Sequence, residues 1–177
     1  MTNMSKIKQL TISASMLALA AVTAMFFHWT GIDVMNVSPL HIPVFVCGLL
    51  CGAYYGGVVG ALTPILAFLL TGRPVPFPPY AQAMIVEMAA YGVVCGFAFK
   101  NLRLPKAASL YITVAAAQLL GRVCGGAVFA VFPRPPMMPY NFDIFLADYF
   151  VKTLPAIILQ LVLIPPLVLA LGKVVKE

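Results

Sequence analysis

Four ionisable side chains stand within long apolar stretches, and they are the residues of this sequence best suited to chemistry: Glu87, Arg122, Asp148 and Lys152. A helix rises about 1.5 Å per residue. Measured from the expected outer ends of their helices, Glu87 lies roughly 10 Å deep and Asp148 roughly 7 Å deep. Arg122 and Lys152 both lie roughly 13 Å deep. Charges at such depths in a bilayer are costly, so this level predicts either mutual pairing or a polar cavity.

The functional interpretation is a polar pocket that opens outward and binds an anion. Arg122 is the preferred anchor because its planar, forked guanidinium matches a carboxylate. Gln118 lies one turn inward on the same helix face and could supply an amide contact, and Glu87 could accept hydrogen bonds from hydroxyl or amide groups. The predicted substrate contacts are Arg122, Glu87, Gln118, Lys152, Asn141, His41, Tyr80 and Tyr91.

The alternative interpretation is that these charges only stabilise the fold. Asp148 and Lys152 are four residues apart and could pair along one helix. Glu87 and Arg122 could bridge two helices in the same way. The inner halves of the three helices carry no charge, which limits the polar region to the outer half.

Catalytic patterns are absent from the sequence. It has no paired carboxylates at catalytic spacing, no HExxH motif and no glycine-rich phosphate loop. Cys47, Cys51, Cys95 and Cys124 stand in apolar segments without His or Asp at ligand spacing, so packing is favoured over a metal site. We therefore expect a protein that is not an enzyme, with no catalytic residue, no metal and no cofactor.

The elements that position these residues are membrane helices. The 177 residues are 62% hydrophobic and only 9% charged, whereas soluble domains carry about 25% charged residues. The apolar runs lack the alternation of a membrane barrel, so the class is all-α integral membrane. The net charge of +6 resides in short clusters between apolar runs, which is typical of membrane topology and not of a nucleic-acid partner.

We expect one domain over residues 1–177, with six transmembrane helices and both termini cytoplasmic. The predicted spans are 10–27, 39–55, 58–70, 80–99, 107–131 and 143–171. The stretch 39–70 is either one long helix or a hairpin turned at Gly56-Gly57. The hairpin places seven Lys and Arg inside and two outside, against four and five for one helix, so the positive-inside rule favours it. Pro155 and Pro165-Pro166 are expected to kink the last span. A signal peptide is the alternative for the first span.

Two proline-rich outer loops, Gly72–Pro79 and Pro133–Pro139, are candidate lids over the pocket, with stiff ordinary turns as the alternative. The predicted lid residues are Arg73, Pro76, Phe77, Pro135 and Met137. The first span carries Ala14-x-x-x-Ala18 and Ala20-x-x-x-Ala24. Small residues at this spacing allow close approach of a second helix, from a partner or from within the chain.

The chain resembles a known family along nearly its whole length. The segments that carry the resemblance are SPLHIPVFVCG (38–48), GALTPIL (60–66), EMAAYG (87–92), LGRVCGG (120–126) and LPAIILQLVLIPP (154–166). In this order, after a first helix rich in small residues, they are similar to the substrate-binding S subunits of energy-coupling factor (ECF) vitamin transporters. The pantothenate-type branch is the most similar one.

The resemblance implies a division of labour in the cell membrane. An S subunit captures a vitamin from outside beneath its loops and docks through its first helix, by Ala14, Ala18, Ala20 and Ala24, onto a membrane coupling subunit. Two ATPase subunits supply the energy, and the S subunit topples in the membrane to release its cargo. Pantothenate, with its carboxylate, hydroxyls and amide, suits Arg122 and Glu87.

Other functions remain open at this point. The chain could be an S subunit for folate, biotin or riboflavin. A stand-alone small transporter or channel would need polar residues through the inner half as well, and the spans are apolar there. A lipid-acting membrane enzyme would need a nucleophile or a metal set, which the sequence lacks.

Overall fold

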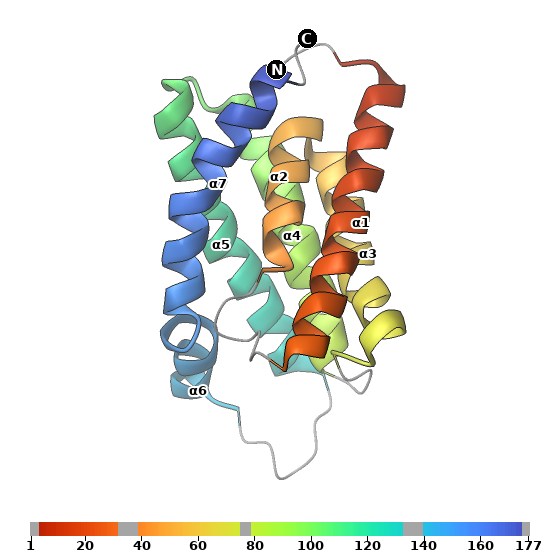
Figure 1. Ribbon diagram of the computed structural model, residues 1–177. Helices are drawn as coiled ribbons and strands as arrows, with labels where there is room; N and C mark the ends of the chain where they lie inside the picture. Colours follow the sequence, from red (N-terminus) through yellow and green to blue (C-terminus); the bar gives the residue numbers. More distant parts are fainter. Residues whose placement is uncertain (1–3, 32–38, 75–78, 133–139, 175–177) are drawn as a thin grey trace.

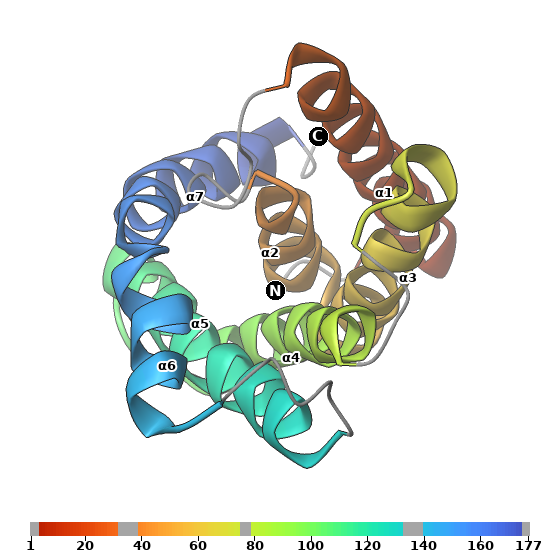
Figure 2. The same cartoon turned by 90° about the horizontal axis from the view of Figure 1, so that it is seen from below.

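A computed structural model of the chain describes residues 4–31, 39–74, 79–132 and 140–174, and its regular secondary structure there is helical. The elements are α1 (Lys6–Thr30), α2 (His41–Cys51), α3 (Ala53–Thr71), α4 (Tyr80–Asn101), α5 (Lys106–Val131), α6 (Phe142–Leu146), the π-helical segment η2 (Ala147–Val151) and α7 (Leu154–Val174). The start of α1 and the end of α7 lie at the same end of the bundle (Figure 1). Seen end-on, α2 lies inside a ring of the other long helices (Figure 2).

Five helices in the described part of the chain are long and apolar enough to cross a membrane: α1, α3, α4, α5 and α7. The sixth expected span is the apolar α2, which has only 11 residues and is shorter than a bilayer crossing requires. In Figure 1, α2 occupies the half of the bundle nearer to the start of α1. Its starting residue, His41, is buried, with 9% of its surface exposed.

The hairpin within 39–70 is present, but its turn is not at Gly56-Gly57 as predicted. The chain reverses at Gly52, which has a φ of 96°, a conformation that only glycine adopts without strain. Gly56 and Gly57 stand inside α3 instead. Gly56 lies so close to Gly48 of α2 that an added Cβ would come within 2.6 Å of its Cα.

The helices α2, α3 and α4 are held together by backbone contact at glycines. A Cβ at Gly92 of α4 would overlap the carbonyl of Gly56, and one at Gly96 would overlap the backbone of Ala53. A Cβ at Gly60 of α3 would overlap the carbonyl of Met88. These close approaches fix α4 and therefore the position of Glu87.

The last predicted span, 143–171, is divided in the structure. It consists of α6, the π-helical η2 and α7, with a turn at Lys152 and Thr153. Pro155 stands in the first turn of α7, where its missing N–H breaks no helical hydrogen bond. Where a kink at Pro155 was expected, the helix is therefore interrupted just before this proline. Pro165 and Pro166 lie inside α7, which continues through them.

The two small-residue pairs of α1 face opposite ways. Ala20 and Ala24 are buried against the rest of the chain, 1% and 7% exposed. Ala14 and Ala18 are exposed. Ser13, which directly precedes Ala14, is buried and accepts a hydrogen bond from Cys47 of α2. One face of α1 therefore packs on α2 and α3, and the face with Ala14 and Ala18 is exposed.

Candidate functional site

The buried face of α5 carries two polar side chains in the middle of the bundle. Gln118 and Arg122, one helical turn apart, are each 3% exposed. Neither amide atom of Gln118 has a hydrogen-bond partner, and neither does Nε of Arg122. Buried polar atoms without partners are rare in folded proteins because their desolvation is not compensated. These atoms point to a site that a ligand or water completes.

The guanidinium of Arg122 is oriented by the break between η2 and α7. Its Nη1 donates to the carbonyl oxygen of Tyr149 and, at 2.5 Å, to Oγ1 of Thr153. The ring of Phe150 lies 5.9 Å from Cζ, within the range of a cation–π contact. Arg122 therefore joins α5 to the broken helix that faces it, while Nε stays without a partner.

Glu87 of α4 lies against α5 on the other side of this site. Its Oε1 accepts a hydrogen bond from the hydroxyl of Tyr91, one turn further along α4. A Cβ at Gly125 of α5 would come within 3.1 Å of Oε2 of Glu87. A Cβ at Gly121 would overlap the ring of Tyr91. The glycines of α5 thus make room for a carboxylate and a phenol on the facing helix.

His41 and Phe45 of α2 complete the cluster from inside the ring of helices. The imidazole of His41 meets the Tyr91 ring edge-on, with 5.3 Å between centroids. Phe45 stacks on the same ring at 4.9 Å. The structure therefore brings together five predicted residues, from α2, α4 and α5: His41, Glu87, Tyr91, Gln118 and Arg122.

The two alternative charge pairings have different outcomes. In the described ranges, a single ion pair has atoms within 4.0 Å, and it joins Lys152 Nζ to Asp148 Oδ1 at 2.6 Å. Both side chains are exposed, 66% and 44%, so Lys152 is on the surface and not in the buried cluster. The alternative of a direct Glu87–Arg122 bridge is wrong. Burying two charges without pairing them costs several kcal/mol by rough estimate, so this arrangement calls for a third group.

Tyr80 and Asn141, two of the predicted substrate contacts, are not part of the buried cluster. Tyr80 packs edge-on against Phe129 of α5, with 5.2 Å between ring centroids. Asn141 is the N-cap of α6, and its side-chain oxygen accepts from the Ile144 N–H at 2.9 Å. Both side chains are exposed on the surface of the bundle.

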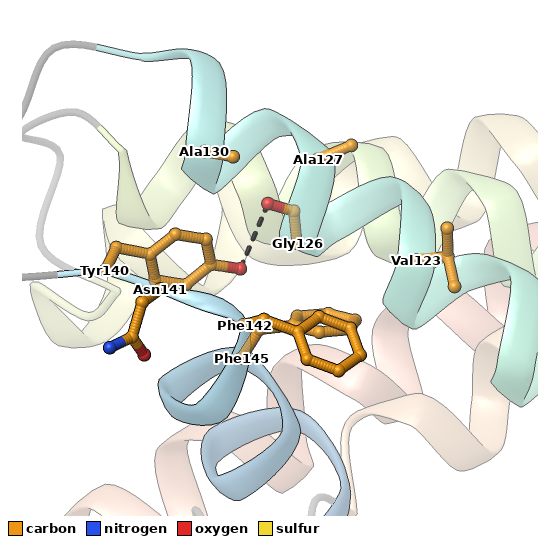
Figure 3. Close-up of a pocket in the computed structure, with 8 residues that line it drawn as sticks. All are labelled: Val123, Gly126, Ala127, Ala130, Tyr140, Asn141, Phe142 and Phe145. Atoms are coloured by element: carbon orange, nitrogen blue, oxygen red, sulfur yellow. Dashed lines mark hydrogen bonds between the residues drawn. The ribbon is translucent and has the colours of Figure 1, made fainter.

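A groove of about 420 Å³ lies between the C-terminal part of α5 and α6 (Figure 3). It is lined by Val123, Gly126, Ala127, Ala130, Tyr140, Asn141, Phe142 and Phe145. The hydroxyl of Tyr140 donates to the carbonyl of Gly126 at 3.1 Å, as Figure 3 shows. None of the charged residues lines this groove, so it is separate from the cluster around Arg122.

Four of the five predicted lid residues, Pro76, Phe77, Pro135 and Met137, lie outside the described residues. The fifth, Arg73, is exposed, and its carbonyl accepts from the Thr71 hydroxyl at 3.3 Å. The lids therefore stay a prediction.

Several polar residues of the site escaped the sequence analysis. Tyr149 and Thr153 contact Arg122, and only the nearby Pro155 signalled that a helix break would present them. The N-terminal half of α5, which was expected to be the inner half, is also less apolar than predicted. Ser109 and Thr113 are 2% and 0% exposed there, and their hydroxyls have no hydrogen-bond partner.

Across the parts of the chain that the structure describes, no group of three or more His, Cys, Asp or Glu side chains is placed to hold a metal ion. What the cluster offers is a buried cation, a buried carboxylate and an amide, which can bind a polar ligand.

Comparison with known proteins gives one informative result. The family model described as ECF transporter, substrate-specific component, matches residues 8–168, which is most of the chain. Neither curated proteins nor solved structures gave a match.

Proposed function

Because the chain belongs to the family of ECF transporter substrate-specific components, we propose that it captures a small vitamin with a carboxylate group, with pantothenate as the best candidate. Members of this family are transporter subunits and work with an ECF module, and the apolar helices make this one a multi-pass membrane protein.

The observation that carries the proposal is the incomplete bonding of Arg122 and Gln118. Both are buried, and each keeps at least one polar atom without a partner. A carboxylate accepts from two N–H groups of one guanidinium, and such charge-assisted pairs are about twice as strong as neutral hydrogen bonds. A ligand carboxylate on Arg122 would neutralise the buried cation that Glu87 does not pair with.

Pantothenate matches the rest of the cluster. Its hydroxyl groups are donors for Glu87, whose Oε1 already accepts from Tyr91. Its amide is a partner for Gln118, which needs both a donor and an acceptor. Lys152 was predicted as a second cation for the ligand. It bonds to Asp148 on the surface, so the proposal rests on Arg122.

The docking partner of this subunit is, in our proposal, a membrane coupling subunit that is joined to two ATPase subunits in the cell membrane. The exposed pair Ala14 and Ala18 is the proposed docking face, because Ala20 and Ala24 are already used inside the chain. Six membrane segments with both termini cytoplasmic fit the basic residues near the ends of α1 and α7, where the positive-inside rule places them.

Thermal unfolding of the purified protein in detergent tests this function. A ligand that binds only the folded state raises the melting temperature by mass action. Pantothenate should raise it in a panel with folate, biotin and riboflavin, and Arg122→Lys should lose the shift because the fork is lost while the charge is kept. Arg103→Gln, at an exposed arginine after α4, is the control that should bind normally.

Each other outcome has a distinct meaning. If another vitamin raises the melting temperature and pantothenate does not, the family role stands and pantothenate is not the substrate. If pantothenate still raises the melting temperature of Arg122→Lys, the Arg122 guanidinium is not the group that binds the carboxylate. Transport by the purified chain alone in liposomes would favour a stand-alone transporter over a subunit.

A further inference from the structure

We infer that Thr153 is a positioning residue that decides which edge of the Arg122 guanidinium faces the ligand. The inference rests on the proposed function, in which Arg122 receives a carboxylate. Thr153 lies in the turn between η2 and α7 and is not among the predicted substrate contacts, although its neighbour Lys152 is. Three hydrogen bonds join its hydroxyl, the Tyr149 carbonyl and the Arg122 guanidinium.

These hydrogen bonds form a closed triangle. Nη1 of Arg122 donates to the Tyr149 carbonyl and to Oγ1 of Thr153. The Thr153 hydroxyl donates to the same Tyr149 carbonyl at 2.6 Å. A carbonyl can only accept and a guanidinium can only donate. The single proton of the threonine hydroxyl is therefore directed to Tyr149, and its lone pairs are left to face Arg122.

The acceptor role distinguishes Thr153 from other threonines of this chain. Thr11, Thr23 and Thr63 also donate to the carbonyl four residues earlier, at 2.7 to 3.0 Å. Such back-bonding is ordinary for threonine in membrane helices. Only at Thr153, among the described threonines, does a hydrogen bond from a charged side chain arrive as well.

The helix break makes this triangle possible. The N–H of Lys152 bonds to the carbonyl of Ala147, five residues earlier, at 2.9 Å, which is the π-helical spacing. Pro155 then prevents the α-helical pattern from resuming before α7 begins at Leu154. Carbonyl groups at a helix end lack partners within the helix. The Tyr149 carbonyl is satisfied by side chains instead, and one of them is Arg122.

The consequence is an oriented cation. Nη1 donates to Tyr149 and Thr153 at the helix break. Nε lies on the edge of the guanidinium that does not include Nη1, and it is buried without a partner. The edge that carries Nε is therefore the one presented to a ligand carboxylate. Without the Thr153 acceptor, Nη1 would keep one bond instead of two, and the guanidinium could turn away. Contacts of the ligand with Gln118 and Glu87 would not change.

The test compares a carboxylate with its uncharged analogue. Dissociation constants for pantothenate and for pantothenol, its primary alcohol, are measured on the wild-type protein, Thr153→Val and Thr153→Ser. Valine has the shape of threonine without the acceptor, and serine keeps the acceptor. We expect Thr153→Val to weaken pantothenate binding by about tenfold with little change for pantothenol, and Thr153→Ser to restore the wild-type preference.

A ligand-free measurement accompanies it. Melting temperatures of Thr153→Val, Arg122→Lys and the double variant form a thermodynamic cycle, and residues in direct contact give non-additive effects. Additive effects would overturn the inference, as would a Thr153→Val protein with the wild-type preference for pantothenate. If the wild-type protein binds neither compound, the proposed substrate fails, and the cycle alone decides whether Thr153 holds Arg122.

Discussion

The hydroxyl of Tyr91 donates a hydrogen bond to Oε1 of Glu87, one turn away on α4. Tyr91 is 1% exposed, and its ring is enclosed by His41, by Phe45 and by Gly121 of α5. The phenol cannot move without disturbing α2 and α5. It therefore fixes one oxygen of the carboxylate and leaves the other, which lies towards Gly125, to other contacts.

Removing this hydroxyl should cost stability. A hydrogen bond to a charged group contributes about 1.5–3 kcal/mol, so Tyr91→Phe should lower the free energy of unfolding by about that amount. The control is Tyr54→Phe, at a tyrosine that is 77% exposed. Thermal unfolding in detergent measures both. Equal melting temperatures for the two variants would show that the Tyr91 hydroxyl does not stabilise Glu87.

Much of the fold could be predicted because membrane helices follow simple local rules. Long apolar runs predicted the five helices that the structure finds long enough to span. The position of the hairpin turn could not be predicted, because glycine serves two purposes. Gly52 supplies a positive φ and Gly56 supplies close packing, and the residue type alone does not distinguish them.

The candidate site was predicted in part, for a similar reason. Sequence gives the depth of a side chain in a membrane helix, and depth grouped Arg122 with Lys152. It does not give the direction in which each side chain points near a helix break. Lys152 turns to the surface and pairs with Asp148, whereas the next residue, Thr153, contacts Arg122. The contact depends on the π-helical turn, and the kink expected at Pro155 was the one sign of it in the sequence.

The glycine contact between α3 and α4 predicts a large difference between two substitutions. In Gly92→Ala the new methyl group would overlap the Gly56 carbonyl, and backbone atoms cannot move aside as a flexible side chain can. Overpacking of this kind costs about 1–3 kcal/mol or more. Gly172→Ala in α7 has nothing within 4 Å and should be neutral or stabilising by about 0.5–1 kcal/mol.

Expression and melting temperature of the two variants measure this difference. A Gly92→Ala protein as stable as Gly172→Ala would mean that α3 and α4 can separate at little cost. The position of Glu87 would then not be fixed by this contact.

The surface ion pair predicts a weak effect. Exposed pairs contribute about 0–1 kcal/mol, so Lys152→Gln should change stability very little. Because Lys152 lies outside the buried cluster, the vitamin-induced rise in melting temperature should also stay near the wild-type value. If Lys152→Gln loses this rise as fully as Arg122→Lys does, Lys152 leaves Asp148 and contacts the ligand, and the proposed site must be enlarged.

Substitutions at the two alanine pairs of α1 should have different effects, one pair on docking and the other on the stability of the fold. Ala14→Leu and Ala18→Leu place bulk on the exposed face, where it would keep the coupling subunit from approaching closely. These proteins should bind the vitamin normally but fail to co-purify with the coupling and ATPase subunits. Ala20→Leu and Ala24→Leu place the same bulk inside the chain, where overpacking costs about 1–3 kcal/mol.

Co-purification and melting temperature, measured on all four variants, distinguish the two faces. The two variants at the buried alanines should have a lowered melting temperature whether or not the coupling and ATPase subunits are present. The two variants at the exposed alanines should keep the wild-type melting temperature. Normal assembly of both Ala14→Leu and Ala18→Leu would place the docking surface elsewhere. The small residues on the open face of α1 would then need another explanation, such as packing against lipid.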